Sequence, residues 1–127
     1  MRIIGHGVDI VEVARIAGMV ARHEDRFLQR VFTEGERAYA ARSVKRSNEH
    51  LAARFAAKEA VLKALGTGWR DGIAWTDVEV THEPSGRPVV RLSGVAATTA
   101  LSLGISAWHL SISHTDHHAM ASVIAEG

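Results

Sequence analysis

Near the middle of the chain stands the run Arg54-Phe55-Ala56-Ala57-Lys58-Glu59-Ala60-Val61-Leu62-Lys63-Ala64. At about 3.6 residues per helical turn, Arg54 lies one turn from Lys58, and Glu59 lies one turn from Lys63. Apolar residues, mostly alanine, fill the positions between and opposite these charges. The pattern predicts a helix that is packed on most of its circumference and whose charged side chains therefore require partners.

Start and stop signals bound this helix and predict others before it. The central helix is expected to begin after a cap at Ser47 or Asn48 and to end at Gly66. The run Thr33-Glu34-Gly35-Glu36 has the capping-box pattern and predicts a shorter helix to about Arg42. Two further helical segments are expected at 14–22 and 27–32.

Strand signals dominate the rest of the chain. Residues 3–13 are β-rich with Gly5 and Gly7 inside, which predicts a strand that another segment approaches closely, with Asp9 on it or just after it. After a glycine-punctuated loop at 66–72, strands are expected at 75–81, 88–92, 107–113 and 119–124, with a helix from Gly94 to about Leu103. The predicted class is α+β, one domain over residues 1–127, with helices mainly in the first half packed on a small, mainly antiparallel sheet.

Composition narrows the possible functions. The chain has 127 residues, 46% of them apolar, and no cysteine, which excludes disulfides, zinc–thiolate sites and thiol catalysis. The first residues lack the apolar core of a secretory signal, and no run approaches the roughly 18 apolar residues of a membrane span. We therefore expect a cytoplasmic protein with no membrane partner.

The charges are unevenly distributed. Through Lys63 the chain has 12 basic and 8 acidic residues, against 3 and 6 afterwards. A basic N-terminal half favours an anionic partner, which composition alone leaves open among a phosphate compound, a nucleic acid and an acidic protein.

Two carboxylates from distant segments, Asp9 and Glu59, form the candidate metal site. Mg²⁺ takes hard oxygen ligands and is usually bound through one or two carboxylates and a substrate phosphate. The two carboxylates, together with the cations Arg54, Lys58 and Lys63, therefore suit Mg²⁺ bound to a polyphosphate. The alternative is structural: Asp9 caps the end of a strand, and Glu59 pairs with Lys63 on a solvated face.

Four motifs in register resemble one family. They are Gly7-Val8-Asp9-Ile10-Val11-Glu12, the central helix from Arg54 to Ala64, Gly66-Thr67-Gly68 after it, and Ser111-Ile112-Ser113-His114, with Ser85-Gly86-Arg87-Pro88 matching as a connecting stretch. In this order and spacing, from about Ile3 to Val123, the chain resembles the holo-acyl-carrier-protein synthases, the small stand-alone phosphopantetheinyl transferases.

The resemblance implies a site for coenzyme A. It implies that Asp9 and Glu59 bind Mg²⁺ with the pyrophosphate and that catalysis depends on Asp9, Glu59 and Lys63. It further implies that coenzyme A is bound by Lys45, Arg46, Arg54, Lys58, Lys63, Gly66, Gly68 and His114, with Lys45, Arg46 and Arg54 around the 3′-phosphate. The implied reaction transfers 4′-phosphopantetheine from coenzyme A to a serine of apo acyl carrier protein, in support of fatty-acid or polyketide synthesis.

The resemblance also implies partners. Arg15, Met19, Arg22 and Arg26 recur at helical spacing and match the helix with which the family docks its acidic carrier protein. They form one row if the helix continues through Asp25. The family further implies a homotrimer with active sites between subunits.

Other functions fit parts of the sequence. An Arg-rich nucleic-acid-binding module would use the basic half, although interleaved aromatic residues for base stacking are lacking. A Mg²⁺-dependent nucleotide hydrolase would share the metal site but not the docking row. A Ser113–His114 nucleophile pair is disfavoured, since adjacent strand residues point to opposite faces. A zinc site at His109, His114, His117 and His118 is disfavoured because, without cysteine, its ligands would have to converge from one hairpin, where a turn places polar residues in any case.

Overall fold

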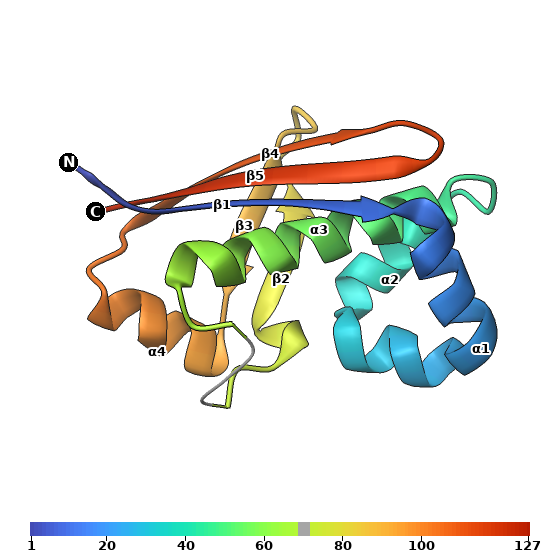
Figure 1. Cartoon of the computed structure of the whole chain (residues 1–127), viewed down its shortest axis with the longest axis horizontal. Helices are drawn as coiled ribbons and strands as arrows, with labels where there is room; N and C mark the ends of the chain where they lie inside the picture. Colours follow the sequence, from blue (N-terminus) through green and yellow to red (C-terminus); the bar gives the residue numbers. More distant parts are fainter. Residues whose placement is uncertain (69–71) are drawn as a thin grey trace.

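Helices occupy most of the first half of the chain, and most strands follow them (Figure 1). The computed structural model describes residues 1–68 and 72–127. The first half contains β1 (Ile3–Glu12), α1 (Val13–Val31), α2 (Glu34–Ala41) and α3 (Ser47–Leu65). The second half contains the short 3₁₀ helix η1 (Trp75–Asp77), β2 (Val78–His82), β3 (Pro88–Leu92), α4 (Gly94–Ser102), β4 (Ala107–His114) and β5 (His118–Glu126). The part of the predicted glycine loop at 69–71 lies outside the described residues.

The described strands form two antiparallel sheets. One sheet has the order β1-β5-β4, with β5 in the centre, and the other is the β2-β3 hairpin. The predicted α+β class and antiparallel pairing are confirmed. The strands are divided between two sheets, which the sequence could not show, because periodicity identifies strands without showing which strands share hydrogen bonds.

Helix α3 lies under the three-stranded sheet and forms the centre of the core (Figure 1). The sheet face turned toward it is lined by small side chains from β5, all fully buried: Ala119, Ala121, Val123 and Ala125. On the helix, Ala52, Ala56, Ala57, Ala60 and Val61 are also fully buried. The predicted helix packed on most of its circumference is thus confirmed. None of the described helices has the length and apolar character needed to cross a membrane.

At α2 and α3 the helix ends match the sequence signals with one exception. Thr33 and Glu36 form the predicted capping box at the start of α2, and Gly66 ends α3 in the left-handed conformation at φ 78°. The predicted cap of α3 at Ser47 or Asn48 is wrong, because Ser47 is already helical and Arg46 occupies the cap position. The Arg46 amide is held instead by Ser43 in the preceding turn.

Helix α1 is interrupted at Glu24, whose backbone has φ 44° and ψ −124°. This conformation strains any residue with a Cβ but suits glycine. Glu24→Gly is therefore expected to raise the free energy of unfolding by about 1 kcal/mol, measured by urea denaturation. Glu24→Ala, which removes the carboxylate but keeps the Cβ, is the matched control. If the alanine variant gains as much stability as the glycine variant, backbone strain is not the cause.

Candidate active site

Two glycines bring β1 into direct contact with α3. A Cβ at Gly5 would collide with the carbonyl oxygen of Ala64, and one at Gly7 would collide with the carbonyl oxygen of Ala60. The close approach predicted from glycine in this strand is therefore observed. Because alternate strand residues share a face, Asp9 continues the row of Gly5 and Gly7 along the helix.

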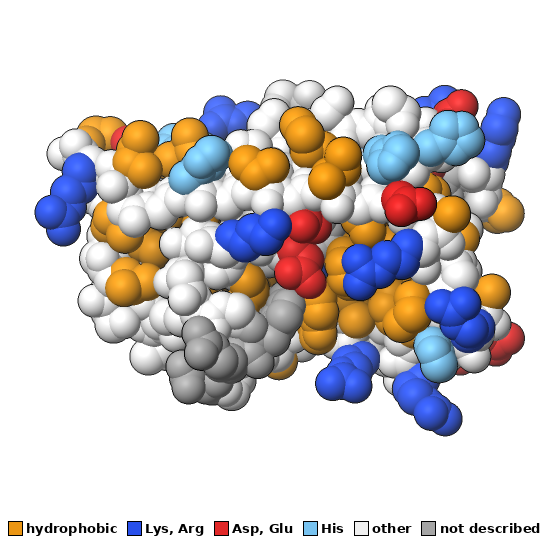
Figure 2. Space-filling view, in the orientation of Figure 1, with side chains coloured by type: hydrophobic (Ala, Val, Ile, Leu, Met, Phe, Trp, Pro, Cys, Tyr) orange, Lys and Arg blue, Asp and Glu red, His pale blue; other side chains and the backbone are white. Residues whose placement is uncertain are grey.

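This contact places Asp9 beside the second charged pair of the helix. The Lys63 ammonium lies 3.1 Å from the Asp9 carboxylate and donates to the carbonyl oxygen of Val8 at 2.8 Å. The Lys63 side chain is 53% exposed and that of Asp9 is 19% exposed, so both groups remain accessible. In Figure 2 the surface over β1 and α3 has acidic side chains with basic side chains on either side.

Glu59 belongs to the same corner of the molecule. It precedes Ala60, whose carbonyl faces Gly7, and it lies one turn before Lys63. Two carboxylates with an adjacent ammonium fit a hard divalent cation that also carries a phosphate. Among the described residues there is no group of three or more His, Cys, Asp or Glu side chains that could hold a metal ion.

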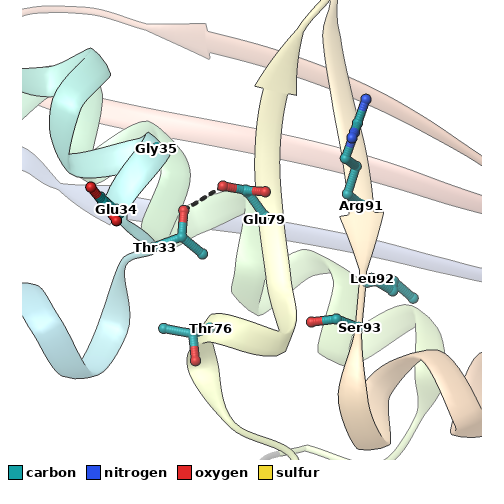
Figure 3. Close-up of a pocket in the computed structure, with 8 residues that line it drawn as sticks. All are labelled: Thr33, Glu34, Gly35, Thr76, Glu79, Arg91, Leu92 and Ser93. Carbon is teal, nitrogen blue, oxygen red and sulfur yellow. Dashed lines mark hydrogen bonds between the residues drawn. The ribbon is translucent and has the colours of Figure 1, made fainter.

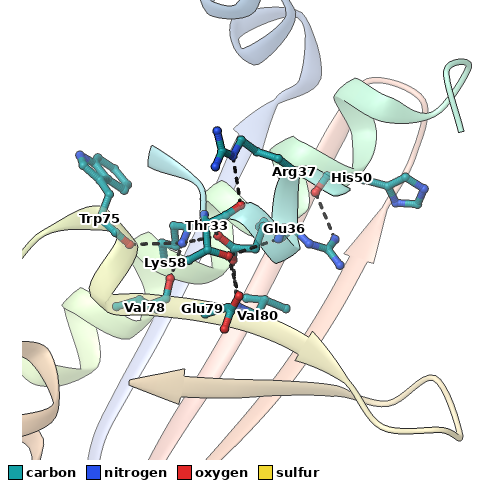
Figure 4. Close-up of polar contacts among 10 residues, drawn as sticks. Thr33, Glu36, Arg37, His50, Lys58, Trp75, Val78, Glu79 and Val80 are labelled. Carbon is teal, nitrogen blue, oxygen red and sulfur yellow. Dashed lines mark hydrogen bonds and ion pairs between the residues drawn. The ribbon is translucent and has the colours of Figure 1, made fainter. Parts of the chain in front are cut away.

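Lys58 does not belong to the phosphate site, contrary to expectation. Its side chain is fully buried, and its ammonium lies 2.7 Å from a Glu36 carboxylate oxygen (Figure 4). It also donates to the backbone carbonyls of Trp75 and Val78. Because an ammonium has three hydrogens and these three oxygens use them, Lys58 has no donor left for a ligand. The sequence showed a cation on the helix but not the direction in which it points.

The remaining predicted phosphate ligands lie on another face of α3. Nine residues of helix turn through about 180° net, so Arg54 and Lys63 point in opposite directions from the axis. Arg54 faces α2 and β2 and lines a cavity together with His114 from the end of β4. Lys45 and Arg46 are exposed in the turn just before α3, at the same end of the helix. The predicted site residues therefore form two groups, one on each side of a buried helix.

The two glycines assigned to nucleotide binding follow α3. Gly66 and Gly68 both have positive φ, at 78° and 62°, and a Cβ at either would meet nothing within 4 Å. Their conformations, rather than crowding, require glycine here. Gly66 acts as the helix cap, and its expected role near the nucleotide remains a prediction.

The predicted docking row is shorter than expected. Arg15, Met19 and Arg22 share one face of α1, and an Arg22 nitrogen lies 3.6 Å from the Met19 sulfur. Arg26 follows the interruption at Glu24, so the regular helical spacing that would align it with the other three is lost. The prediction that Arg26 belongs to the row is therefore corrected.

A larger cavity of about 420 Å³ lies between the start of α2 and the β2-β3 hairpin (Figure 3). Its lining residues include none of those predicted from the sequence, and the Thr33 hydroxyl donates to Glu79 at 2.6 Å across it. Sequence reasoning also missed Glu36 and two histidines beside Arg54, His50 and His82. Glu36 could be seen only as a capping residue, and a lone histidine on a helix or at a strand end carries no signal of its own.

Comparisons with known proteins identify the family of the chain. A model of the 4′-phosphopantetheinyl transferase superfamily matches residues 5–123. A holo-[acyl-carrier-protein] synthase from Koribacter versatilis is 52% identical over 124 residues, which cover 98% of each chain. The structure of holo-[acyl-carrier-protein] synthase from Neisseria meningitidis superposes with a TM-score of 0.88 at 35% identity, covering 99% of this chain and 100% of that one. The chain therefore belongs to the 4′-phosphopantetheinyl transferase superfamily.

Within that superfamily, the chain is similar over nearly its whole length to the holo-[acyl-carrier-protein] synthases. A holo-(acyl-carrier-protein) synthase structure from Bacillus anthracis, in complex with CoA (3′,5′-ADP), superposes with a TM-score of 0.81 at 38% identity, covering 98% of this chain and 97% of that one. The family resemblance inferred from the four motifs is thus confirmed.

Proposed function

We propose that this protein transfers the 4′-phosphopantetheine group of coenzyme A to a serine hydroxyl of apo acyl carrier protein. The observation that carries the proposal is the ion pair between Asp9 and Lys63 beside Glu59, in a chain that matches the family over residues 5–123. Nucleic-acid binding and nucleotide hydrolysis are the weaker alternatives, because neither accounts for the similarity to synthases along the whole chain. The proposed location is the cytoplasm.

The chemistry follows from the charges at this corner. Mg²⁺, when bound by Asp9 and Glu59, would neutralise charge on the pyrophosphate. Lys63 fixes the Asp9 carboxylate and, being half exposed, can also reach a phosphate oxygen. The serine oxygen bonds to the β-phosphorus, the bond from that phosphorus to the bridging oxygen breaks, and adenosine 3′,5′-bisphosphate leaves. Glu59, or a water held by one carboxylate, takes the serine proton. Catalysis is mainly positioning and electrostatic stabilisation.

The two-sided arrangement around α3 favours sites shared between copies of the chain. Arg54 and His114 lie on one side of the helix, and Asp9 and Lys63 lie on the other. A coenzyme A bound to both groups of a single chain would have to reach around the buried helix and its sheet, whereas one bound between two copies would not. We therefore propose the homotrimer expected from the family, with each site formed by the first group of one copy and the second group of its neighbour.

The face of α1 with Arg15, Met19 and Arg22 is the proposed docking surface for the acidic carrier. Arg15→Glu and Arg22→Glu should each raise the KM for the carrier about tenfold at low salt, because rim charges act through long-range attraction. Steady-state assays over a salt series should show a flatter salt dependence of kcat/KM and an unchanged KM for coenzyme A. Arg26→Glu, beyond the interruption, is the control and should have a smaller effect. Unchanged carrier KM in Arg15→Glu and Arg22→Glu would leave this face an ordinary solvated one.

The proposed reaction is tested by the mass of the carrier protein. Apo carrier incubated with this protein, coenzyme A and Mg²⁺ should gain the mass of one 4′-phosphopantetheine group per molecule. Release of adenosine 3′,5′-bisphosphate in equal amount should accompany it. Nucleotide cleavage with unmodified carrier would instead support the hydrolase.

A further inference from the structure

Arg54 is a buried cation without a counterion of its own. The residue is 2% exposed, and its Nε is buried without a hydrogen-bond partner in the described part of the chain. Its guanidinium carbon lies 4.1 Å from the centre of the Tyr39 ring, and Nη1 donates to the carbonyl oxygen of His50 at a long 3.4 Å. No ion pair among the described residues includes it. Burying a charge in this way is costly, and an anion in the adjoining cavity would offset that cost.

The cavity beside Arg54 is lined by three histidines. It has a volume of about 220 Å³ and receives His50 from α3, His82 from the end of β2, and His114 from the end of β4. The His82 ring stacks on Tyr39 with centroids 4.7 Å apart, and its Nδ1 lies 3.4 Å from Arg54 Nη2. Because a guanidinium can only donate, Nδ1 must accept this bond, so the ring is neutral with its proton on Nε2.

The surroundings of His50 and His82 favour their neutral forms when no ligand is bound. Burial, followed by the positive charge of Arg54, lowers the pKa of both His50 and His82 below the ordinary 6.5. For His50, nearby His114 and Arg46 act in the same direction, and Glu49 opposes them. In the pH range just below 6.5, the unfolded chain therefore binds more protons at these positions than the folded protein, so stability falls as the pH falls.

None of the carboxylates near the cavity forms an ion pair with Arg54 among the described residues. Glu49 lies 4.0 Å from His114 Nδ1, at the rim. Glu36 forms its ion pair with Lys58, whose Nζ lies 2.7 Å from Oε1. Burial lowers the pKa of Arg54, and the charge of Glu36 opposes this shift by favouring the protonated form. On β2 and after it, Glu79 accepts from the Thr33 hydroxyl and Glu83 pairs with Arg87. On the α2 side, the Arg42 guanidinium lies over the Tyr39 ring, with its central carbon 5.5 Å from the ring centre. The Arg54 guanidinium is thus the buried charge of the cavity, and Glu49 is the carboxylate at its rim.

We propose that His50 and His82 bind a phosphate group of the donor together with Arg54, and that each takes up a proton from solvent when the phosphate binds. The proposal rests on the proposed function, which supplies coenzyme A as the donor. Once His82 is protonated at Nδ1, it can no longer accept from Arg54, so both side chains are released to donate to the phosphate oxygens. Doubly charged phosphate monoesters are then selected over the corresponding alcohols, which is the difference between coenzyme A and its 3′-dephospho form.

Histidine titration by nuclear magnetic resonance tests the proton uptake directly. The ring proton shifts of wild-type protein are followed against pH in sodium chloride, in sodium sulfate of equal ionic strength, and with coenzyme A. Sulfate keeps its charge over this range, unlike a phosphate monoester whose second pKa is about 6, so any change belongs to the protein. The pKa of His50 and of His82 should rise in sulfate and rise further with coenzyme A. The ring signal of His109, paired with Glu126 on the other face of the sheet, should not respond.

Binding measurements on variants give the second readout. His50→Gln and His82→Gln should each weaken coenzyme A binding about tenfold at pH 6 and little at pH 8.5, because a charge-assisted hydrogen bond is lost only where the histidine is protonated. Both should raise the KM for coenzyme A without lowering kcat, and both should reduce the preference over the 3′-dephospho form. His109→Gln is the matched control and should change none of these.

The outcomes separate this inference from the proposed function. If coenzyme A binds and transfer proceeds while the pKa values of His50 and His82 stay the same in all three solutions, the inference is overturned and the function stands. If sulfate raises both pKa values but coenzyme A neither binds nor is consumed, the anion site stands and the proposed donor is wrong. Variants that weaken binding equally at pH 6 and pH 8.5 would also overturn the proton uptake, since a structural defect has no such pH dependence.

Discussion

Glu59→Gln is expected to lower kcat by about 100- to 1000-fold, the usual effect of removing one group that stabilises developing charge. Asp9→Asn should have an effect of the same order. Both changes remove a negative charge while preserving shape, and neither side chain is part of the apolar core. The measurement is single-turnover transfer to apo carrier at saturating coenzyme A, repeated over a series of Mg²⁺ concentrations.

The Mg²⁺ series distinguishes a metal ligand from a structural carboxylate. Loss of a ligand should raise the Mg²⁺ concentration that gives half-maximal activity, as well as lowering the maximum. Glu83→Gln is the control, because Glu83 is exposed and pairs only with Arg87 among the described ion pairs. Wild-type rates in Glu59→Gln at limiting Mg²⁺ would remove Glu59 from the metal site.

Glu36→Ala is expected to destabilise the protein by about 3–5 kcal/mol, because it leaves a fully buried ammonium without its counter-charge. The loss includes two further hydrogen bonds, since the Glu36 carboxylate also accepts from the backbone amides of Thr33 and Val80. These contacts join α2, α3 and β2 (Figure 4), so the loss affects the whole core. Urea denaturation followed by circular dichroism measures the change.

The double variant Glu36→Leu with Lys58→Met separates charge from shape. Without either charge the desolvation cost disappears, so this variant should be more stable than Glu36→Ala. Burial already lowers the pKa of Lys58, with Glu36 opposing the effect. In Glu36→Ala the unfolded chain would hold the lysine proton at a pH where the folded chain does not, so stability should rise toward alkaline pH. The pair would not be a coupled unit if the double variant were destabilised more than Glu36→Ala, as expected for two independent losses, and if the stability of Glu36→Ala did not depend on pH.

The sequence predicted elements well where the signal is local. The capping box at Thr33, the end of α3 at Gly66 and the close approach at Gly7 all follow from rules that act within a few residues. The cap of α3 was misjudged because the helix already begins at Ser47, so that Arg46 occupies the cap position and makes no side-chain capping hydrogen bond. The β2-β3 hairpin forms a separate sheet because pairing depends on the fold as a whole.

The sequence could not predict the directions in which the charged side chains of α3 point. Residue types and spacing placed Lys58 and Lys63 together with the phosphates, yet one points into the core and the other toward solvent. A cation on an Ala-rich helix has the same sequence signal in both cases, and only the position of Glu36 in the fold decides between them. For the same reason the separation of Arg54 from Asp9 across α3 became visible only in three dimensions.

Because of that separation, we propose that a working site takes one group of residues from each of two copies. Arg54→Gln impairs the group that contains Arg54 and His114, and Glu59→Gln impairs the group that contains Asp9 and Lys63. An oligomer made of either variant alone should therefore be nearly inactive. If the two are unfolded together and refolded as a random mixture, about one quarter of the neighbouring pairs in any closed ring should join two intact groups. Transfer of 4′-phosphopantetheine by the mixture should therefore recover to about one quarter of the wild-type rate, by the same count of pairs. A mixture no more active than the sum of its two inactive parts would contradict shared sites and would require each chain to hold a complete site by itself.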